Sequence, residues 1–168
     1  GRWEGGIPVS PSCNARCLGC ISLQPAECCP SPQSRIVFKP TPAEIAEVAL
    51  PHLLHGKENM VSFGQGCEGE PALASATIVK AIGTIREATA LGTINMNSNG
   101  GHNAGVADIC KAGLDSIRVS LISAREDIYN SYYRPRGYSL DDVRRSIRAA
   151  VSCGVYTALN LLVFPGLT

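Results

Sequence analysis

Short apolar segments alternate with longer segments of helical periodicity along this sequence, and the alternation limits the folds that the chain can adopt. Met60-Val61-Ser62-Phe63 is an example of the first kind, because it is short, apolar and followed by a glycine-rich turn. Residues 72–90 are an example of the second kind, with Ile78, Ile82 and Ile85 at helical spacing. Such alternation favours right-handed crossovers between parallel strands. The predicted strands are residues 5–10, 60–63, 92–97, 115–121 and 155–163.

The predicted helices begin at recognisable capping sequences. Thr41-Pro42-Ala43-Glu44 combines a capping box with proline at the first helical position, and Pro51 is expected to kink or end the helix that follows. Ser123-Ala124-Arg125-Glu126 is interpreted as a second capping box, and Ser139-Leu140-Asp141-Asp142 is expected to start a helix that ends at Gly154. Two further helices are predicted at about residues 72–90 and 103–112.

The order of these elements predicts the fold class. Five strands with helices outside them fit an α/β fold, part of a TIM-like βα barrel with parallel strands and five visible βα units. Residues 1–168 have the length of one typical domain, within which residues 21–41 hold four prolines and are predicted to be an irregular insertion. The chain opens almost at the first strand and closes inside a strand and turn, so we expect it to be part of a longer protein.

Polar residues follow the predicted strands, where a βα barrel carries its chemistry. The second strand is followed by the glycine-rich acidic loop 64–71, and the third strand is followed by the turn 97–101. Ser120 lies at the end of the fourth strand, and Asn160 lies in the fifth. Because the carboxyl ends of parallel strands meet at one rim, we expect these groups to face the loop that follows the first strand.

That first loop carries Cys13, Cys17 and Cys20 in the spacing C-x3-C-x2-C. Thiolates on one loop can reach a common centre, and they favour zinc, copper(I) or iron–sulfur clusters. A structural zinc site prefers a closed tetrahedral set of protein ligands, usually as separated pairs. The three cysteines on a [4Fe–4S] cluster would leave one iron without a protein ligand, which favours a chemical role. A zinc knuckle or a set of inert thiols stays open as an alternative.

Composition and charge restrict the compartment and the partners. Apolar residues make up 45% of the chain and charged residues 17%, so a sizeable core is expected. A net charge of +1 gives no support for nucleic acid or an anionic membrane as a partner. No stretch has the length of a transmembrane helix, and residues 1–12 lack the features of a secretion signal. The eight cysteines are therefore interpreted as thiols of a cytoplasmic protein, not as a disulfide framework.

The cysteine spacing resembles the signature of the radical S-adenosylmethionine (radical SAM) superfamily. Glu68-Gly69-Glu70-Pro71 is similar to the Gly-Gly-Glu-Pro motif of that family. The resemblance implies that Glu70, beside Gly69, holds the methionyl ammonium of SAM, a role that suits a carboxylate flanked by glycine. In this family the barrel has six βα units, so the resemblance implies a partial (βα)6 TIM-like barrel. The resemblance extends over nearly the whole chain, through the fifth unit.

Polar residues later in the chain resemble further SAM contacts of the family. They lie at the carboxyl ends of the third, fourth and fifth predicted strands. The implied contacts are Asn97, Asn99 and Ser120 for the ribose and the methionyl carboxylate, and Asn160 with the turn Phe164-Pro165-Gly166 for the adenine.

The resemblance also implies the chemistry. Cys13, Cys17 and Cys20 would each bind one iron of a [4Fe–4S] cluster, and the amino and carboxylate groups of SAM would bind the fourth. An electron from an external donor would cleave the carbon–sulfur bond of SAM, and the 5′-deoxyadenosyl radical would abstract hydrogen from a small-molecule or peptide substrate. The protein would bind and orient the reactants and exclude water and oxygen.

The sequence departs from the family pattern at two positions. The residue before the third cysteine is often an aromatic that contacts adenine, but here it is Gly19. The first residue of the Gly-Gly-Glu-Pro motif is Glu68, so either of two acids could bind SAM, and Glu70 is preferred because it aligns with Gly69 and Pro71. No sixth strand is visible.

Other functions fit parts of the sequence. Within the same superfamily, the chain could be an activating enzyme that places a radical on a partner protein. Outside it, an iron–sulfur electron carrier would lack the usual fourth cysteine and would leave the Glu70 loop without a purpose. A structural zinc module is a third alternative, which predicts stoichiometric zinc and no brown colour. Cys28-Cys29 could complete a zinc site or join an auxiliary cluster, and Asn97 and Asn99 could be simple turn formers. The stretch Tyr132–Tyr138 could grip an anionic or peptide substrate, or pack on the barrel.

Overall fold

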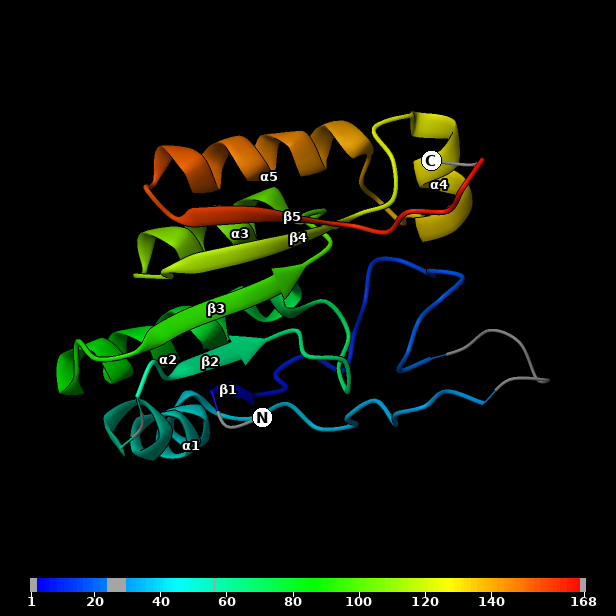
Figure 1. Cartoon of the computed structure of the whole chain (residues 1–168). Helices are drawn as coiled ribbons and strands as arrows, with labels where there is room; N and C mark the ends of the chain where they lie inside the picture. The colour runs from blue at the N-terminus through cyan, green and yellow to red at the C-terminus, as the bar shows by residue number, and fades with distance from the viewer. Residues whose placement is uncertain (1–2, 24–29, 56, 167–168) are drawn as a thin grey trace.

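The computed structural model describes residues 3–23, 30–55 and 57–166. Its strands form one parallel sheet in the order β1-β2-β3-β4-β5 (Figure 1). The α/β class and the partial barrel of five strands predicted from the sequence are confirmed. The strands are β1 (Glu4–Gly6), β2 (Met60–Phe63), β3 (Thr93–Ser98), β4 (Ser116–Leu121) and β5 (Tyr156–Leu161).

The helices other than α4 cover one face of the sheet, and α4 lies beyond the carboxyl ends of the parallel strands (Figure 1). The longest helices have 14 residues, and no helix in the described part of the chain is long and apolar enough to cross a membrane. The helices are α1 (Pro42–His55), the 3₁₀ helix η1 (Pro71–Ala74), α2 (Ser75–Ala88), α3 (Asn103–Lys111), α4 (Glu126–Tyr133) and α5 (Leu140–Ser152).

The pleat of the strands separates an apolar face from a polar face. Ile94, Met96 and Ile117 are fully buried in the core that the sheet forms with the helices. The alternate residues point to the opposite, concave face, where the register sets Asn97 beside Arg118 and Ser120 beside Asn160. The concave face is therefore polar.

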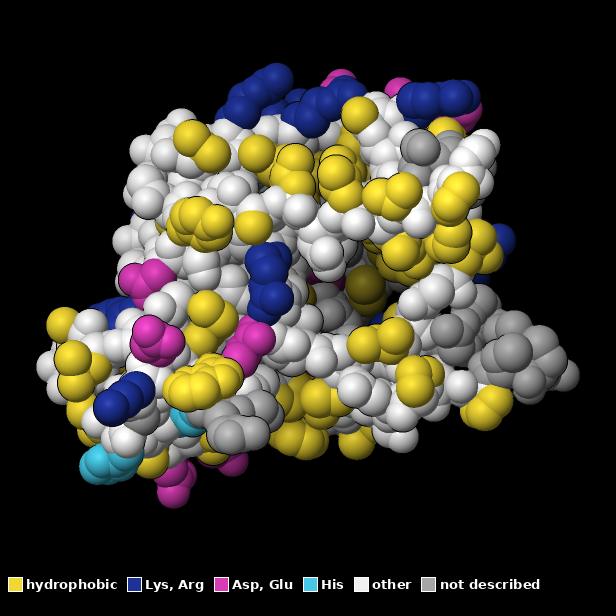
Figure 2. Space-filling view, in the orientation of Figure 1, with side chains coloured by type: hydrophobic (Ala, Val, Ile, Leu, Met, Phe, Trp, Pro, Cys, Tyr) yellow, Lys and Arg dark blue, Asp and Glu magenta, His cyan; other side chains and the backbone are white. Residues whose placement is uncertain are grey.

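The edge strand β5 differs from the central strands because its side chains are exposed. Tyr156, Leu159 and Leu161 have exposed fractions of 74%, 49% and 55%. Figure 2 shows hydrophobic side chains gathered along this edge and around the hollow next to it. Tyr156 lies on the concave face and Leu159 and Leu161 lie on the helical face, so β5 is uncovered on both faces.

Three sequence predictions differ from the structure. The first strand is Glu4–Gly6, not 5–10, because the backbone amides of Val9 and Ser10 donate to a carboxylate instead of a strand. Pro51 does not end α1, which continues to His55 because the burial of residues such as Leu53 outweighs one lost hydrogen bond. The capping box predicted at 123–126 does not form.

The reason for the missing cap is local. Ser123 accepts a hydrogen bond from the amide of Arg125, so it closes a turn before the helix, and α4 begins at Glu126 without a side-chain cap. The capping box of Ser139 and Asp142 is confirmed at the start of α5. The described residues of 21–41 contain no helix or strand.

Candidate functional site

The cysteine loop lies at the carboxyl end of the sheet, between β1 and α1 (Figure 1). Its backbone is attached to the end of α4. The amides of Arg16 and Leu18 donate to the carbonyls of Tyr133 and Tyr132 at 2.9 and 3.0 Å, and the amide of Arg136 donates to the carbonyl of Asn14 at 2.8 Å. These bonds fix the loop, so the position of the thiols is defined by the fold.

Cys13, Cys17 and Cys20 are half-buried free thiols that interact electrostatically with one another. Burial, reinforced by the two neighbouring cysteines, raises the pKa of Cys17 to about 12. Burial also raises the pKa of Cys13. Cys20 differs, because the effect of burial is outweighed by hydrogen bonds from Ser22, which lower its pKa. A metal ion would displace the protons of Cys13 and Cys17 on binding.

The chemistry of the three thiols fits an iron–sulfur cluster. Soft thiolates are the ligands of such clusters, and a cubane cluster binds each cysteine through a different iron. In the described part of the chain, no group of three His, Cys, Asp or Glu side chains lies close enough together to hold a single metal ion. Cys28 and Cys29 lie outside the described residues.

Glu70 is buried, and the protein engages both of its carboxylate oxygens. Oε1 accepts from Ser98 Oγ at 2.6 Å and from the amide of Ala72 at 3.1 Å, and Oε2 accepts from the amide of Asn99 at 2.8 Å. Despite these bonds, burial raises the pKa of Glu70 to about 7. Glu70 therefore joins the loop after β2 to the turn after β3, and a contact with the ammonium group of SAM stays a prediction.

Glu68 has a different set of partners. Its Oε2 accepts from the amides of Val9 and Ser10 at 2.8 and 3.0 Å, and its Oε1 accepts from the amide of Gly64. The side chain is buried, with an exposed fraction of 4%. Glu68 thus connects the chain that enters the cysteine loop to the end of β2, which accounts for an acid at this position of the motif.

Gly69 lies directly against the cysteine loop. Its amide donates to the carbonyl of Ser10 at 2.6 Å, and the amide of Glu70 donates to that of Ser12 at 2.8 Å. A Cβ atom at position 69 would lie 1.9 Å from the carbonyl oxygen of Ser12, the residue before Cys13. Only glycine permits this approach of the two backbones.

The turn after β3 also contacts the cysteine loop. Asn99 is buried, its Nδ2 donates to Asn14 Oδ1 at 2.7 Å, and its Oδ1 accepts from the amide of Gly101 at 2.8 Å. Asn97 is half-buried on the concave face, and its Nδ2 donates to the carbonyl of Gly64 at 3.3 Å. Both residues therefore join neighbouring loops of the rim, a role beyond that of simple turn formers.

Ser120 and Asn160 are register partners on β4 and β5. Both lie on the concave face, where Ser120 is half-buried and Asn160 is exposed. The structure thus places all the predicted site residues at the carboxyl end of the sheet. Glu70 and Asn99 are buried beneath the rim, whereas Asn97, Ser120 and Asn160 face the open side.

Two contacts at the cysteine loop were not predicted from the sequence. Arg35, from the 21–41 segment, donates from Nη2 to Cys20 Sγ at 3.5 Å. A Cβ atom on Gly19 would lie 2.6 Å from the hydroxyl of Tyr132, so that hydroxyl fills the space of a larger side chain. Neither contact has a sequence signal, because the partners are far apart in the chain and no periodic pattern connects them.

The tyrosines near the loop mostly pack against one another. The rings of Tyr129 and Tyr133 lie 4.7 Å apart, and the hydroxyls of Tyr129 and Tyr138 lie 3.3 Å apart. Tyr129 and Tyr133 are buried. This arrangement favours packing on the barrel as the main role of these side chains.

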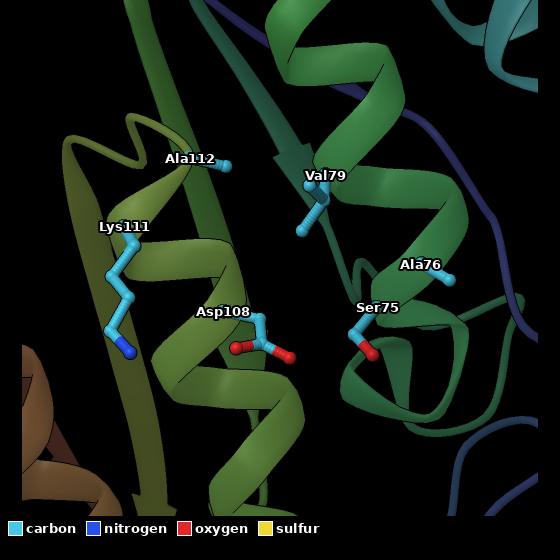
Figure 3. Close-up of a pocket in the computed structure, with 6 residues that line it drawn as sticks. All are labelled: Ser75, Ala76, Val79, Asp108, Lys111 and Ala112. Carbon is cyan, nitrogen blue, oxygen red and sulfur yellow. The ribbon is translucent and has the colours of Figure 1, made fainter.

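A separate groove lies on the helical layer between α2 and α3 (Figure 3). Its volume is about 400 Å³, and none of the predicted site residues lines it. Asp108 points from α3 toward Ser75 of α2, and Val79 points into the groove from α2, whereas the side chain of Lys111 extends along the side of α3 that faces away from α2. It is distinct from the rim described above.

The chain is similar to proteins of one superfamily. The Radical SAM superfamily model matches residues 7–168. The structure of anSMEcpe with bound AdoMet has a TM-score of 0.63 at 17% identity and covers 93% of this chain and 43% of its own. The FeFe-hydrogenase maturase HydG from Carboxydothermus hydrogenoformans has a TM-score of 0.63 at 14% identity, with coverages of 95% and 36%. TYW1 with a lysine-pyruvate adduct bound has a TM-score of 0.64 at 16% identity, with coverages of 97% and 57%.

At such low identities the structural similarity shows the fold alone. The chain spans between 36% and 57% of the length of HydG, anSMEcpe and TYW1 in these structures. No curated protein matches the sequence significantly.

Proposed function

Because the chain belongs to the radical SAM superfamily, we propose that it binds a [4Fe–4S] cluster on Cys13, Cys17 and Cys20 and SAM on the adjoining rim. One observation carries the proposal. The cysteine loop is hydrogen-bonded directly to the loop after β2 and to the turn after β3, through Glu70 and Asn99. The thiols and the predicted SAM-binding residues therefore form one connected unit.

The cofactors, when bound, supply a 5′-deoxyadenosyl radical that abstracts hydrogen from a substrate. The chain's residues bind and orient the reactants. Gly69 and Glu70 would present the loop after β2 to the methionyl ammonium, and Ser120 and Asn160 would line the open side of the rim. Asn97 and Asn99 would contribute their side-chain amides to the SAM site at the end of β3.

The polar concave face supports a polar substrate, and we propose a small molecule or a peptide. TYW1 was solved with a lysine-pyruvate adduct and anSMEcpe with the peptide Cp18Cys, so both classes occur among structures with this fold. We further propose an external electron donor, a net oxidoreductase reaction and a cytoplasmic location, where free thiols such as Cys13 persist.

Anaerobic reconstitution with iron and sulfide, followed by dithionite and SAM, tests the proposal. We expect 5′-deoxyadenosine and methionine from the parent protein and from Cys153→Ala, in which the replaced thiol is exposed and outside the cysteine loop. We expect neither product from Cys17→Ala. A fully loaded cluster without SAM cleavage would indicate an electron carrier instead, and stoichiometric zinc in a colourless protein would indicate a structural module.

A further inference from the structure

The segment 30–41 is attached to the candidate site at two points. The amide of Gln33 donates to the carbonyl of Ile21 at 3.2 Å, next to the third cysteine of the loop. The amide of Ile36 donates to the carbonyl of Cys67 at 2.8 Å, within the loop after β2. The residues between these points are therefore held beside the thiols.

Arg35 lies between the two attachment points and is half-buried. Its Nη2 donates to Cys20 Sγ at 3.5 Å, and its Nε donates to Ser22 Oγ at 3.1 Å. Ser22 is buried, and its hydroxyl donates to the carbonyl of Glu68 at 3.0 Å. The guanidinium group is thus fixed by two hydrogen bonds, one of them to a candidate cluster ligand.

The charge of Arg35 acts on more than one thiol, because it is an electrostatic partner of both Cys13 and Cys20. The negative charge of buried Glu70 has the opposite effect, because it disfavours the thiolate forms of Cys13 and Cys17. A cluster on three thiolates would therefore gain negative charge in a site that already contains a carboxylate. A cation that donates a hydrogen bond to a ligand sulfur stabilises the reduced cluster more than the oxidised one.

We propose that Arg35 is a positioning residue that raises the reduction potential of the [4Fe–4S] cluster on the cysteine loop. The inference rests on the proposed function, since it requires that cluster. The step concerned is the transfer of one electron from a low-potential donor to the oxidised cluster, and no bond forms or breaks. Arg35 would thus make the cluster easier to reduce.

A potentiometric titration of the reconstituted cluster, followed by electron paramagnetic resonance (EPR) without SAM, tests the inference. Arg35→Met is expected to shift the potential to a more negative value at unchanged iron and sulfide content. Lys39→Met, which removes an exposed cation of the same segment, is expected to leave the potential unchanged. Equal potentials for Arg35→Met and the parent protein would overturn the inference.

Two further variants separate charge from packing. Arg35→Lys keeps the charge and Arg35→Gln keeps a donor without charge, so we expect the potential of the Lys variant to be the higher one. If Arg35→Met loses its cluster, the comparison of Arg35→Lys with Arg35→Gln tests the inference instead. Equal reduction potentials in these two variants would contradict the proposed effect of Arg35.

The potential is measured without SAM, so its outcome is independent of SAM cleavage. A shifted potential in a protein that forms no 5′-deoxyadenosine would support the role of Arg35 and contradict the proposed function. SAM cleavage with an unshifted potential would do the reverse. A parent protein that forms no four-iron cluster would overturn both.

Discussion

Gly69 is the residue whose backbone position the site constrains most tightly. A methyl group there would collide with the carbonyl of Ser12, so the two backbones must separate to accept it. The amide bonds from positions 69 and 70 to the cysteine loop would be lost with that separation. The contact between the cysteine loop and the loop after β2 therefore requires glycine at position 69.

Gly69→Ala is expected to lower the free energy of unfolding of the apoprotein by about 2 kcal/mol. Gly83→Ala is the matched control, because Gly83 lies inside α2 with no atom within 4 Å of an added Cβ. This control is expected to be more stable than the parent protein by about 0.5–1 kcal/mol. Urea unfolding measures both changes, and a neutral Gly69→Ala would show that the approach of the loops is not tight.

The carboxyl group of Glu70 gives the apoprotein a dependence on pH. Burial raises its pKa from 4.5 to about 7, so the folded chain holds this proton more tightly than the unfolded chain. The stability that the proton contributes is full below pH 4.5 and is lost as the pH rises through about 7. The free energy of unfolding changes by about 3 kcal/mol over this range.

Glu70→Gln is expected to remove this dependence. Relative to the parent protein, the variant should gain stability between about pH 5 and about pH 8, although the amide loses an acceptor at every pH. Thermal unfolding of both proteins across that range provides the measurement. Parallel pH profiles would mean that Glu70 does not titrate in this range.

At the scale of elements, the site is held together by bonds between loops that follow different strands. The side chain of Asn99 joins the turn after β3 to Asn14 in the cysteine loop at 2.7 Å. Removing this bond frees one side of the cysteine loop without disturbing the sheet. The rate at which the protein loses its cluster should therefore depend on the hydrogen bond between Asn99 and Asn14.

Asn99→Ala is expected to weaken the cysteine loop by about 1 kcal/mol and to speed the loss of iron to a chelator several-fold. Asn130→Ala is a suitable control, since Asn130 is exposed on α4. The decay of the cluster absorbance after addition of the chelator measures both rates. Equal rates for the two variants would show that the bond between Asn99 and Asn14 contributes nothing.

The elements could be predicted from the sequence where periodicity dominates. β2 was predicted with its observed ends, and the positions of Ser120 and Asn160 in β4 and β5 followed from the alternation of strands and helices. The first strand was misplaced because the amides of Val9 and Ser10 bind Glu68, a partner 58 or more positions away. Periodicity does not describe such contacts between distant residues.

The candidate site was predictable in its ligand types but not in its connections. The spacing of the cysteines identified the donor set, because three of them share one loop. The separate partners of Glu68 and Glu70 depend on burial and on hydrogen bonds between loops, which two neighbouring acids in a sequence do not reveal. The contact of Arg35 with Cys20 crosses a segment without regular structure and had no signal at all.

At the scale of the whole molecule, the sheet separates packing from chemistry. Its helix-covered face holds the apolar core, and its concave face carries a polar network in which Glu4 accepts from Ser62, Gln65 and Arg118. This network joins β1, β2 and β4 across the open face. The cysteine loop and its partners lie at one end of that face.

The EPR spectrum of the reduced, reconstituted protein with and without SAM shows directly whether Cys13, Cys17 and Cys20 hold a [4Fe–4S] cluster whose remaining iron is open to SAM. We predict that SAM changes the spectrum of the parent protein and that Cys17→Ala does not retain a normal cluster. An identical spectrum with and without SAM, or a normal cluster in Cys17→Ala, would contradict the account.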